Sequence, residues 1–268
     1  MIFEKKWKDI LLYIIFSFLF LQLGCSALKQ PVETKPLFHK DAAQILSYLQ
    51  GQNSNVESFQ GIGRVSINSG RSELESNLFI AGKSPLKARL EITHFWGKPL
   101  IHIVIDGRDV SVLSLTQKKF FRCYDGYLDI DHIFLSMLDT KVIWDILAGR
   151  VPILDEVVKA VGYKENEILL FNSSGQIIER ILFSFNPIVA KEIYFPLKEI
   201  TINLSEFRRM NSGYLPLKIE IIEEKPGRAI KIEYKDFQIG NQIPDEIFYL
   251  APLPGYEVIE VGRDLKTQ

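Results

Sequence analysis

The sequence is poor in the residues that most often carry chemistry. Its 268 residues include two cysteines and four histidines. Two cysteines are too few for a structural zinc site, and Cys123 lies in a strand-like apolar segment that is typical of a packed residue. The sequence also lacks a G-x-S-x-G elbow, an H-E-x-x-H motif and a glycine-rich phosphate loop. We therefore predict no catalytic residues, no metal and no cofactor, and a protein that is not an enzyme.

The histidines do not form a ligand set. They are scattered along the chain as His39, His94, His102 and His132. Asp129, Asp131 and His132 could present oxygen and nitrogen to a metal, but an acidic cap at the start of a helix accounts for the same residues. The carboxylates Glu223 and Glu224 precede Lys225-Pro226-Gly227, which is typical of a solvent-exposed hairpin tip, so acid–base chemistry is not favoured there.

A dominant charge of either sign is also lacking. The chain has 32 Lys and Arg against 33 Asp and Glu, which are interspersed and give a net charge of −1. Nucleic-acid surfaces need clustered basic residues, so we expect no nucleic-acid partner. The 47% of hydrophobic residues can fill a true core, in one sizeable domain or two small ones.

The N-terminus carries a short apolar run rather than a long one. Lys5, Lys6 and Lys8 precede a run that extends from Ile10 to Leu21. A basic start followed by about 7 to 15 apolar residues is typical of a secretion signal, whereas a spanning helix needs about 20. The run therefore predicts export of the rest of the chain.

The residues after this run, 22–26, resemble the end of a bacterial lipoprotein signal peptide. The resemblance implies cleavage before Cys25 and attachment of lipid to its sulfur, which would tether the mature protein to a membrane. Gln22 and Leu23 depart from the usual pattern, which has leucine three residues before the cysteine and a small residue next. An uncleaved anchor helix over residues 7–23 is the alternative, and both interpretations place the body outside the cytoplasm.

These features divide the chain into four parts. We assign residues 1–24 to the lipoprotein signal peptide and the polar, proline-containing residues 25–38 to a tether. Residues 39–262 form the predicted domain, and 263–268 a C-terminal tail.

Helical spacing of apolar residues predicts three short helices. Residues 41–49 repeat apolar side chains every three or four positions. An acidic cap predicts a second helix over residues 129–138. The third covers residues 140–148, with Thr140 as its cap and Gly149 ending it.

Alternation of apolar and polar residues dominates the rest of the domain and predicts strands with one buried face. The predicted strands are Phe59–Ile67, Glu73–Ala81, Lys87–Ile92, Ile101–Ile105, Val110–Leu115, Lys119–Tyr124, Ile168–Phe171, Ile177–Phe185, Ala190–Phe195, Ile200–Leu204, Leu217–Ile222 and Ala229–Tyr234. They are short and joined by turns, with no parallel crossover pattern. We therefore expect a mainly β (α+β) fold, with one highly curved antiparallel sheet or barrel of about ten to eleven strands and helices covering its concave face.

Four segments, in this order, resemble the lipoprotein-localisation proteins LolA and LolB and their uncharacterised lipoprotein relatives. Phe59–Val65 looks like their opening strand, and Phe95–Leu100 like the loop before their central hairpin. Trp144–Pro152 is similar to the W-x-x-x-G-x-P pattern that closes the helical lid of LolB, and Ile243–Phe248 to the approach to the last strand. The resemblance implies an unclosed half-barrel with helices as a lid. LolB is itself lipid-anchored, so Cys25 favours the LolB side.

The resemblance further implies an apolar cavity that binds an acyl chain or a lipoprotein. Moving an acyl chain of about 15 methylenes out of a bilayer costs roughly 12 kcal/mol, which needs about 480 Å² of replacement apolar surface. Candidate lining residues are Leu90, Ile92, Ile101, Ile103, Ile105, Phe120, Phe134, Met137, Trp144, Leu217, Ile219, Ile230 and Ile232. The same side chains would also suit an ordinary filled core.

The resemblance also sets our expectations for partners and location. Phe95 and Trp96 are the candidates for a membrane-contact loop. We expect a monomer anchored by its N-terminal lipid, which takes acyl-chain or lipoprotein cargo from a periplasmic LolA-like carrier. Ser26 is not the aspartate that retains lipoproteins at the inner membrane, so we expect the outer membrane, on its periplasmic side. The alternative is a structural or interaction lipoprotein that uses the half-barrel as a scaffold in an envelope complex.

Overall fold

The computed structural model describes residue 37 and residues 39–70, 73–124, 138–224 and 227–261. The chain divides into two compact units, Met1–Lys35 and Pro36–Gln268, and the fold below concerns the second. The predicted signal peptide and nearly all of the tether, with Cys25 and Ser26, lie outside the described residues, as do most of the predicted helix over 129–138 and the C-terminal tail.

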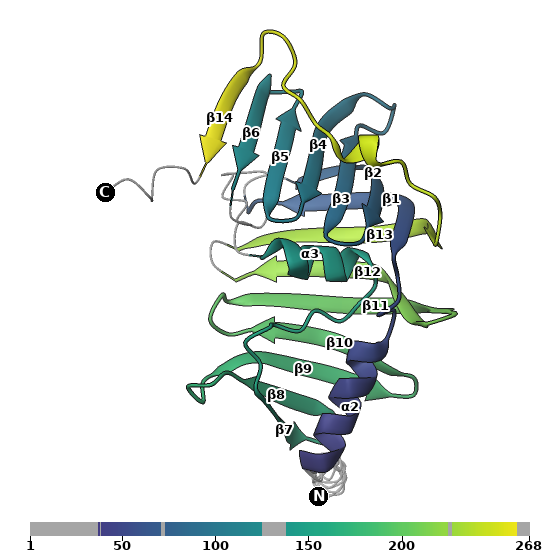
Figure 1. Cartoon of the computed structure of the whole chain (residues 1–268), viewed down its shortest axis with the longest axis vertical. Helices are drawn as coiled ribbons and strands as arrows, with labels where there is room; N and C mark the ends of the chain where they lie inside the picture. The colour runs from purple at the N-terminus through teal and green to yellow at the C-terminus, as the bar shows by residue number, and fades with distance from the viewer. Residues whose placement is uncertain (1–36, 38, 71–72, 125–137, 225–226, 262–268) are drawn as a thin grey trace, which may run out of the picture. The chain divides into compact units, whose positions relative to one another are not determined.

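A single sheet of fourteen strands forms the body of this unit (Figure 1). In chain order the strands are β1 (Ser58–Asn68), β2 (Glu73–Lys83), β3 (Lys87–Thr93), β4 (Pro99–Asp106), β5 (Asp109–Ser114), β6 (Lys119–Cys123), β7 (Lys159–Lys164), β8 (Glu167–Phe171), β9 (Ile177–Phe185), β10 (Ile188–Phe195), β11 (Ile200–Met210), β12 (Gly213–Glu223), β13 (Arg228–Ile239) and β14 (Glu257–Val261). In space they follow the order β14-β6-β5-β4-β3-β2-β1-β13-β12-β11-β10-β9-β8-β7, so the sheet does not close.

The predicted fold class, a curved and unclosed mainly antiparallel sheet, is confirmed. The expected count of about ten to eleven strands is too low, since the sheet has fourteen. Two of these strands, β7 and β14, were not predicted, and they are the two edges. Edge strands bury little of either face, so their sequences carry only a weak apolar alternation. The expectation of a wholly antiparallel sheet is wrong at one place, since β14 pairs parallel to β6.

Two α-helices among the described residues cover one face of the sheet, which we call the inner face (Figure 1). Helix α2 (His39–Gly51) packs against β7 and β10. As predicted, its buried side chains recur at helical spacing, at Ala42, Ile45, Leu46 and Leu49. No helix in the described part of the chain is long and apolar enough to span a membrane.

Helix α3 (Thr140–Leu147) packs across the middle of the inner face. Thr140 is not its cap, as the sequence had suggested: the Asp139 carboxylate accepts a hydrogen bond from the Lys141 backbone N–H at 2.7 Å. Thr140 is the first residue of the helix. From there its hydroxyl cannot accept from the backbone N–H groups of the first turn, which have no partner within the helix. Gly149 follows the helix with φ of +73°, a conformation that favours glycine and ends the helix as predicted.

The chain after β13 crosses the opposite, outer face before it reaches β14. Its short 3₁₀ helix η1 (Asp245–Phe248) brings Ile243 and Phe248 against Ala81 and Val104 of the sheet. The Arg89 guanidinium donates to the carbonyl oxygen of Ile247 at 2.7 Å. This packing carries the chain around to β6, where β14 completes the edge.

Candidate functional site

The contact between α3 and the sheet is the centre of the predicted acyl-binding region. A small apolar cavity remains there, with a volume of about 20 Å³. It is lined by Leu90, Leu138, Ile143, Ile146, Leu147, Ile221, Ile230 and Ile232. Such a volume holds about one water molecule. With α3 in this position, the described residues leave no room for an acyl chain between α3 and the sheet.

Most of the predicted cavity residues lie in the core of the inner face. Nine belong to one buried apolar cluster: Leu90, Ile92, Ile101, Ile103, Ile105, Trp144, Ile219, Ile230 and Ile232. Leu217 is partly buried at the margin of this cluster, whereas Phe134 and Met137 lie outside the described residues. The sheet and α3 thus bring together residues that are far apart in the chain.

Phe120 is buried but lies on the outer face. It pairs with Leu113 of β5, whereas its neighbour Phe121 pairs with Val112 and packs against the inner-face core. Successive residues of a strand point to opposite faces, so one of two adjacent phenylalanines must point away from α3. The sequence alone does not say which one.

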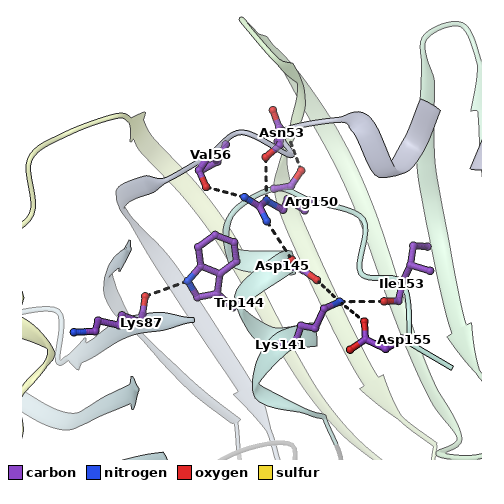
Figure 2. Close-up of polar contacts among 10 residues, drawn as sticks. Asn53, Val56, Lys87, Lys141, Trp144, Asp145, Arg150, Ile153 and Asp155 are labelled. Carbon is purple, nitrogen blue, oxygen red and sulfur yellow. Dashed lines mark hydrogen bonds and ion pairs between the residues drawn. The ribbon is translucent and has the colours of Figure 1, made fainter. Parts of the chain in front are cut away.

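The segment that resembles the LolB lid forms a network that fixes α3 (Figure 2). The Trp144 indole N–H donates to the carbonyl oxygen of Lys87 at 3.1 Å, and its ring meets that of Phe59 edge-on. The Arg150 guanidinium lies 4.6 Å from the centre of the Trp144 ring and donates to the carbonyl oxygens of Asn53 at 3.0 Å and Val56 at 2.8 Å. These contacts join α3 to β3 and to the loop after α2.

Lys141 is the polar centre of the other side of α3 (Figure 2). Its ammonium donates to the carbonyl oxygen of Ile153 at 3.1 Å and pairs with Asp145 at 3.3 Å and Asp155 at 3.4 Å. Burial lowers the pKa of Lys141, but the two carboxylates outweigh this, so its net shift is upward. Burial raises the pKa of Asp145, and Lys141 and Arg150 offset part of that rise.

A buried carboxyl group, Glu179 on β9, was not anticipated. Its side chain is fully buried and lies on the same strand face as Ile181 and Phe183. One oxygen accepts a hydrogen bond from the Leu154 backbone N–H at 3.3 Å, and the other has no hydrogen-bond partner among the described residues. Burial raises its pKa to about 8, against the smaller opposing effects of Leu154 and Lys141. The sequence held one sign of this burial: Glu179 falls in step with Ile181 and Phe183 in the apolar alternation of β9.

Glu223, which precedes the predicted hairpin tip, is buried at the end of β12. Glu223 is 1% exposed, and one of its carboxylate oxygens lies 2.7 Å from the Arg228 guanidinium. It follows Ile219 and Ile221 on the inner-face alternation of β12, so the strand extends one residue further into the hairpin than the charge pattern suggested.

The predicted membrane-contact loop presents two aromatic side chains to solvent. Phe95 and Trp96 are each 68% exposed. The turn is held by backbone hydrogen bonds from His94 to Lys98 and from Gly97 to His94, and the His94 ring stacks on Trp96 at 3.9 Å. The loop between β3 and β4 therefore displays a fixed aromatic pair.

Within the residues that the structure describes, His102 and Cys123 do not belong to a cluster of possible metal ligands. The His102 ring lies 3.1 Å from the Arg89 guanidinium, and burial lowers its pKa. Cys123 is fully buried in β6. Among the described residues, no three His, Cys, Asp or Glu side chains are grouped as metal ligands would be.

No family model matches the chain, and no curated protein sequence matches it. Solved structures share its fold. A domain from Vibrio parahaemolyticus named for outer-membrane lipoprotein sorting aligns with a TM-score of 0.53 at 5% identity, over 78% of this chain and 97% of that chain. A DUF1329 family protein from Desulfovibrio piger ATCC 29098 aligns with a TM-score of 0.52 at 10% identity, over 79% and 97%. A LolA superfamily protein from Nitrosomonas europaea aligns with a TM-score of 0.45 at 16% identity, over 78% and 97%.

At these identities the first two alignments show the fold alone. The first of them is with a domain named for outer-membrane lipoprotein sorting, so the expected likeness to a lipoprotein-sorting protein holds for the fold. The motifs that suggested this likeness are spread over the same part of the chain that forms the sheet and α3.

Proposed function

We propose that this protein is a lipid-anchored protein of the bacterial envelope that binds an acyl chain or a lipoprotein on the inner face of its sheet. The observation that carries the proposal is the apolar contact between α3 and the sheet, in which Ile143 and Ile146 face Leu90, Ile230 and Ile232. Both sides of this contact are apolar, so separating them would expose a surface that an acyl chain can cover.

The size of the cavity defines what binding requires. A cavity of about 20 Å³ cannot hold an acyl chain, since ligand pockets have volumes of about 300–1,000 Å³. An acyl chain that binds there would therefore have to displace α3 from the sheet. The roughly 480 Å² of apolar surface that one chain needs corresponds to several large side chains, and those of α3 and the facing strands suffice.

The exposed aromatic pair supports a second part of the proposal. Phe95 and Trp96 would enter the membrane surface when cargo is delivered, because aromatic rings are favoured at the level of the lipid headgroups. The lipid on Cys25 would keep the domain close to that surface. A LolA-like carrier would supply the cargo, and the protein would act as a monomer at the outer membrane.

The alternative is a scaffold lipoprotein that binds no lipid. The tight packing of α3 on the sheet favours this alternative, because a filled contact needs no ligand. Both functions would use the same fold, so the fold cannot separate them.

Bound lipid separates the two functions. The mature protein has two tryptophans, Trp96 and Trp144. In a Trp96→Phe variant the emission therefore reports on Trp144 in α3. We expect acyl ligands in the mass spectrum of the purified mature domain, and a change in Trp144 emission when palmitate is added. A domain free of acyl ligands, with emission that palmitate leaves unchanged, would favour the scaffold.

The anchor is tested separately. We expect the intact protein to fractionate with outer membranes and a Cys25→Ala variant to lose that association. The mass of the mature N-terminal peptide should show cleavage before Cys25 and added acyl groups. An uncleaved N-terminus would favour the anchor-helix alternative.

A further inference from the structure

An irregular segment, Val151–Val158, which we call the strap, crosses the inner face between α3 and β7 (Figure 1). Two hollows border it. One, of about 470 Å³, lies between the strap, the start of α3 and the turns that end β8 and β10. The other, of about 530 Å³, lies between the strap and α2. Lys141, Ile153, Leu154 and Asp155 line both hollows, so the strap is the partition between them.

The ends of the strap are better fixed than its middle. Arg150 precedes it and is bonded to the loop after α2, and the Val158 N–H donates to the Phe171 carbonyl oxygen at 2.9 Å. In between, the polar contacts to α3 and the sheet that the described residues make are those of Lys141 and the hydrogen bond from the Leu154 backbone N–H to Glu179.

Apolar side chains supply the rest of the attachment. Val151, Ile153, Leu154 and Val157 are partly buried and pack against the inner-face core. They cover the sheet as an acyl chain would, with no regular backbone structure to hold them in place. Removing the strap would join two hollows that each already have the volume of a ligand pocket.

Glu179 lies under the strap, which supplies a hydrogen bond to only one of its two carboxyl oxygens among the described residues. Its register partner on β8 is Leu170, and Ile181 follows on the same face of β9, so its surroundings on the sheet are apolar. Lys141 is the charged side chain that acts on it from α3, and Asp145 and Asp155 already pair with that lysine. A buried carboxyl with one unpartnered oxygen costs stability, and packing alone does not require it. Displacement of the strap would hydrate it.

We propose that the strap Val151–Val158 is a displaceable cover of the apolar surface of β8–β10, beside the contact between α3 and the sheet, that an acyl chain extending past α3 takes its place on this surface, and that ionisation of Glu179 promotes release of the strap. The identity of the occupant, an acyl chain, rests on the function proposed above. The strap and the chain compete for the same apolar surface. Because burial disfavours a charged carboxylate, the state in which the strap covers Glu179 becomes less stable when the carboxyl loses its proton.

Hydrogen exchange of the strap amides tests the release without any ligand. Glu179→Gln keeps the shape of the side chain and removes its ionisation. At each pH, the wild type is compared with this variant, which cancels the pH dependence of exchange chemistry. The measured quantity is the opening equilibrium constant of the strap in the wild type divided by that in the variant. We expect this ratio to rise by up to tenfold per pH unit between about pH 5 and pH 8 and then to level off. Equal exchange in both proteins at all these pH values would overturn the proposal.

Binding of a dansyl-labelled undecanoic acid tests the competition. Leu154→Ser removes an apolar contact of the strap but keeps the backbone N–H that Glu179 accepts. We expect this variant to bind the labelled acid about fivefold more tightly, since the competing cover is weakened. Leu253→Ser, at a position 42% exposed outside the strap, is the matched control and should bind like the wild type.

The outcomes separate this inference from the proposed function. Unchanged or weaker binding by Leu154→Ser, with binding by the wild type intact, overturns the strap as a cover and leaves the proposed function standing. Failure of the labelled acid to bind any of the proteins overturns the proposed function and, with it, the acyl occupant.

Discussion

Glu179 makes the stability of the whole domain depend on pH. The pKa of its carboxyl is about 8 in the folded protein, against 4.5 for an ordinary glutamate. The folded state therefore holds this proton over a range of pH in which the unfolded chain has lost it. The stability that the proton supports is fully present below about pH 4.5 and is lost as the pH rises to about 8.

The size of the loss follows from the difference of about 3.5 pKa units. At 1.36 kcal/mol per unit, the free energy of unfolding falls by at most about 5 kcal/mol between the two limits. Opening of the strap would hydrate the carboxylate without unfolding the domain. If the strap opens first, the loss is limited to the free energy of that opening.

Urea denaturation of wild type and Glu179→Gln between pH 4 and pH 9 measures this loss. We expect the wild type to lose several kcal/mol relative to the variant as the pH rises, with most of the difference developed by pH 8. Taking the difference between the two proteins removes the contributions of all other titrating groups. A constant difference across the range would refute the reasoning, because it would mean that Glu179 titrates alike in the folded and unfolded states.

Three further predictions concern α3 and the aromatic loop. Trp144→Phe removes the hydrogen bond to the Lys87 carbonyl oxygen and should cost about 1–3 kcal/mol in urea denaturation; no loss would show that this bond does not hold α3. Asp139→Ala removes the cap of α3 and should cost about 1 kcal/mol, whereas Thr140→Ala should not show this capping loss; the reverse order would restore Thr140 as the cap. Replacing both Phe95 and Trp96 by Ser should weaken binding of the domain to liposomes in a flotation assay and leave its unfolding midpoint unchanged, since both side chains are 68% exposed. Equal flotation would exclude the loop as a membrane contact.

The candidate site was predictable only in part, for reasons that particular residues make clear. Ile230 and Ile232 repeat every second residue in β13, so their shared face could be read from the chain, and both line the cavity under α3. Phe120 and Phe121 are adjacent and equally apolar. Which of them faces α3 depends on the register of β6 with β5, a tertiary fact.

The two buried glutamates show the same limit for polar residues. Glu179 and Glu223 are ionisable residues at buried positions of their strands. From the sequence alone, such residues are predicted to lie in solvent, and they are buried only where another part of the chain covers or pairs with them. Leu154 of the strap covers Glu179, and Arg228 pairs with Glu223 across a hairpin. Neither neighbour can be identified before the chain is folded.

By itself, the sequence determined the class of the fold, because alternation and helical spacing reflect which side chains must leave water. It also determined that α2 and α3 each have an apolar side, and it supplied the signal-like N-terminus. The tertiary structure decided the edges β7 and β14, the tight packing of α3, and the position of the strap over Glu179. These features depend on contacts between segments that are far apart in the chain. Such contacts leave only a weak local pattern in the sequence, so they could not be predicted from it.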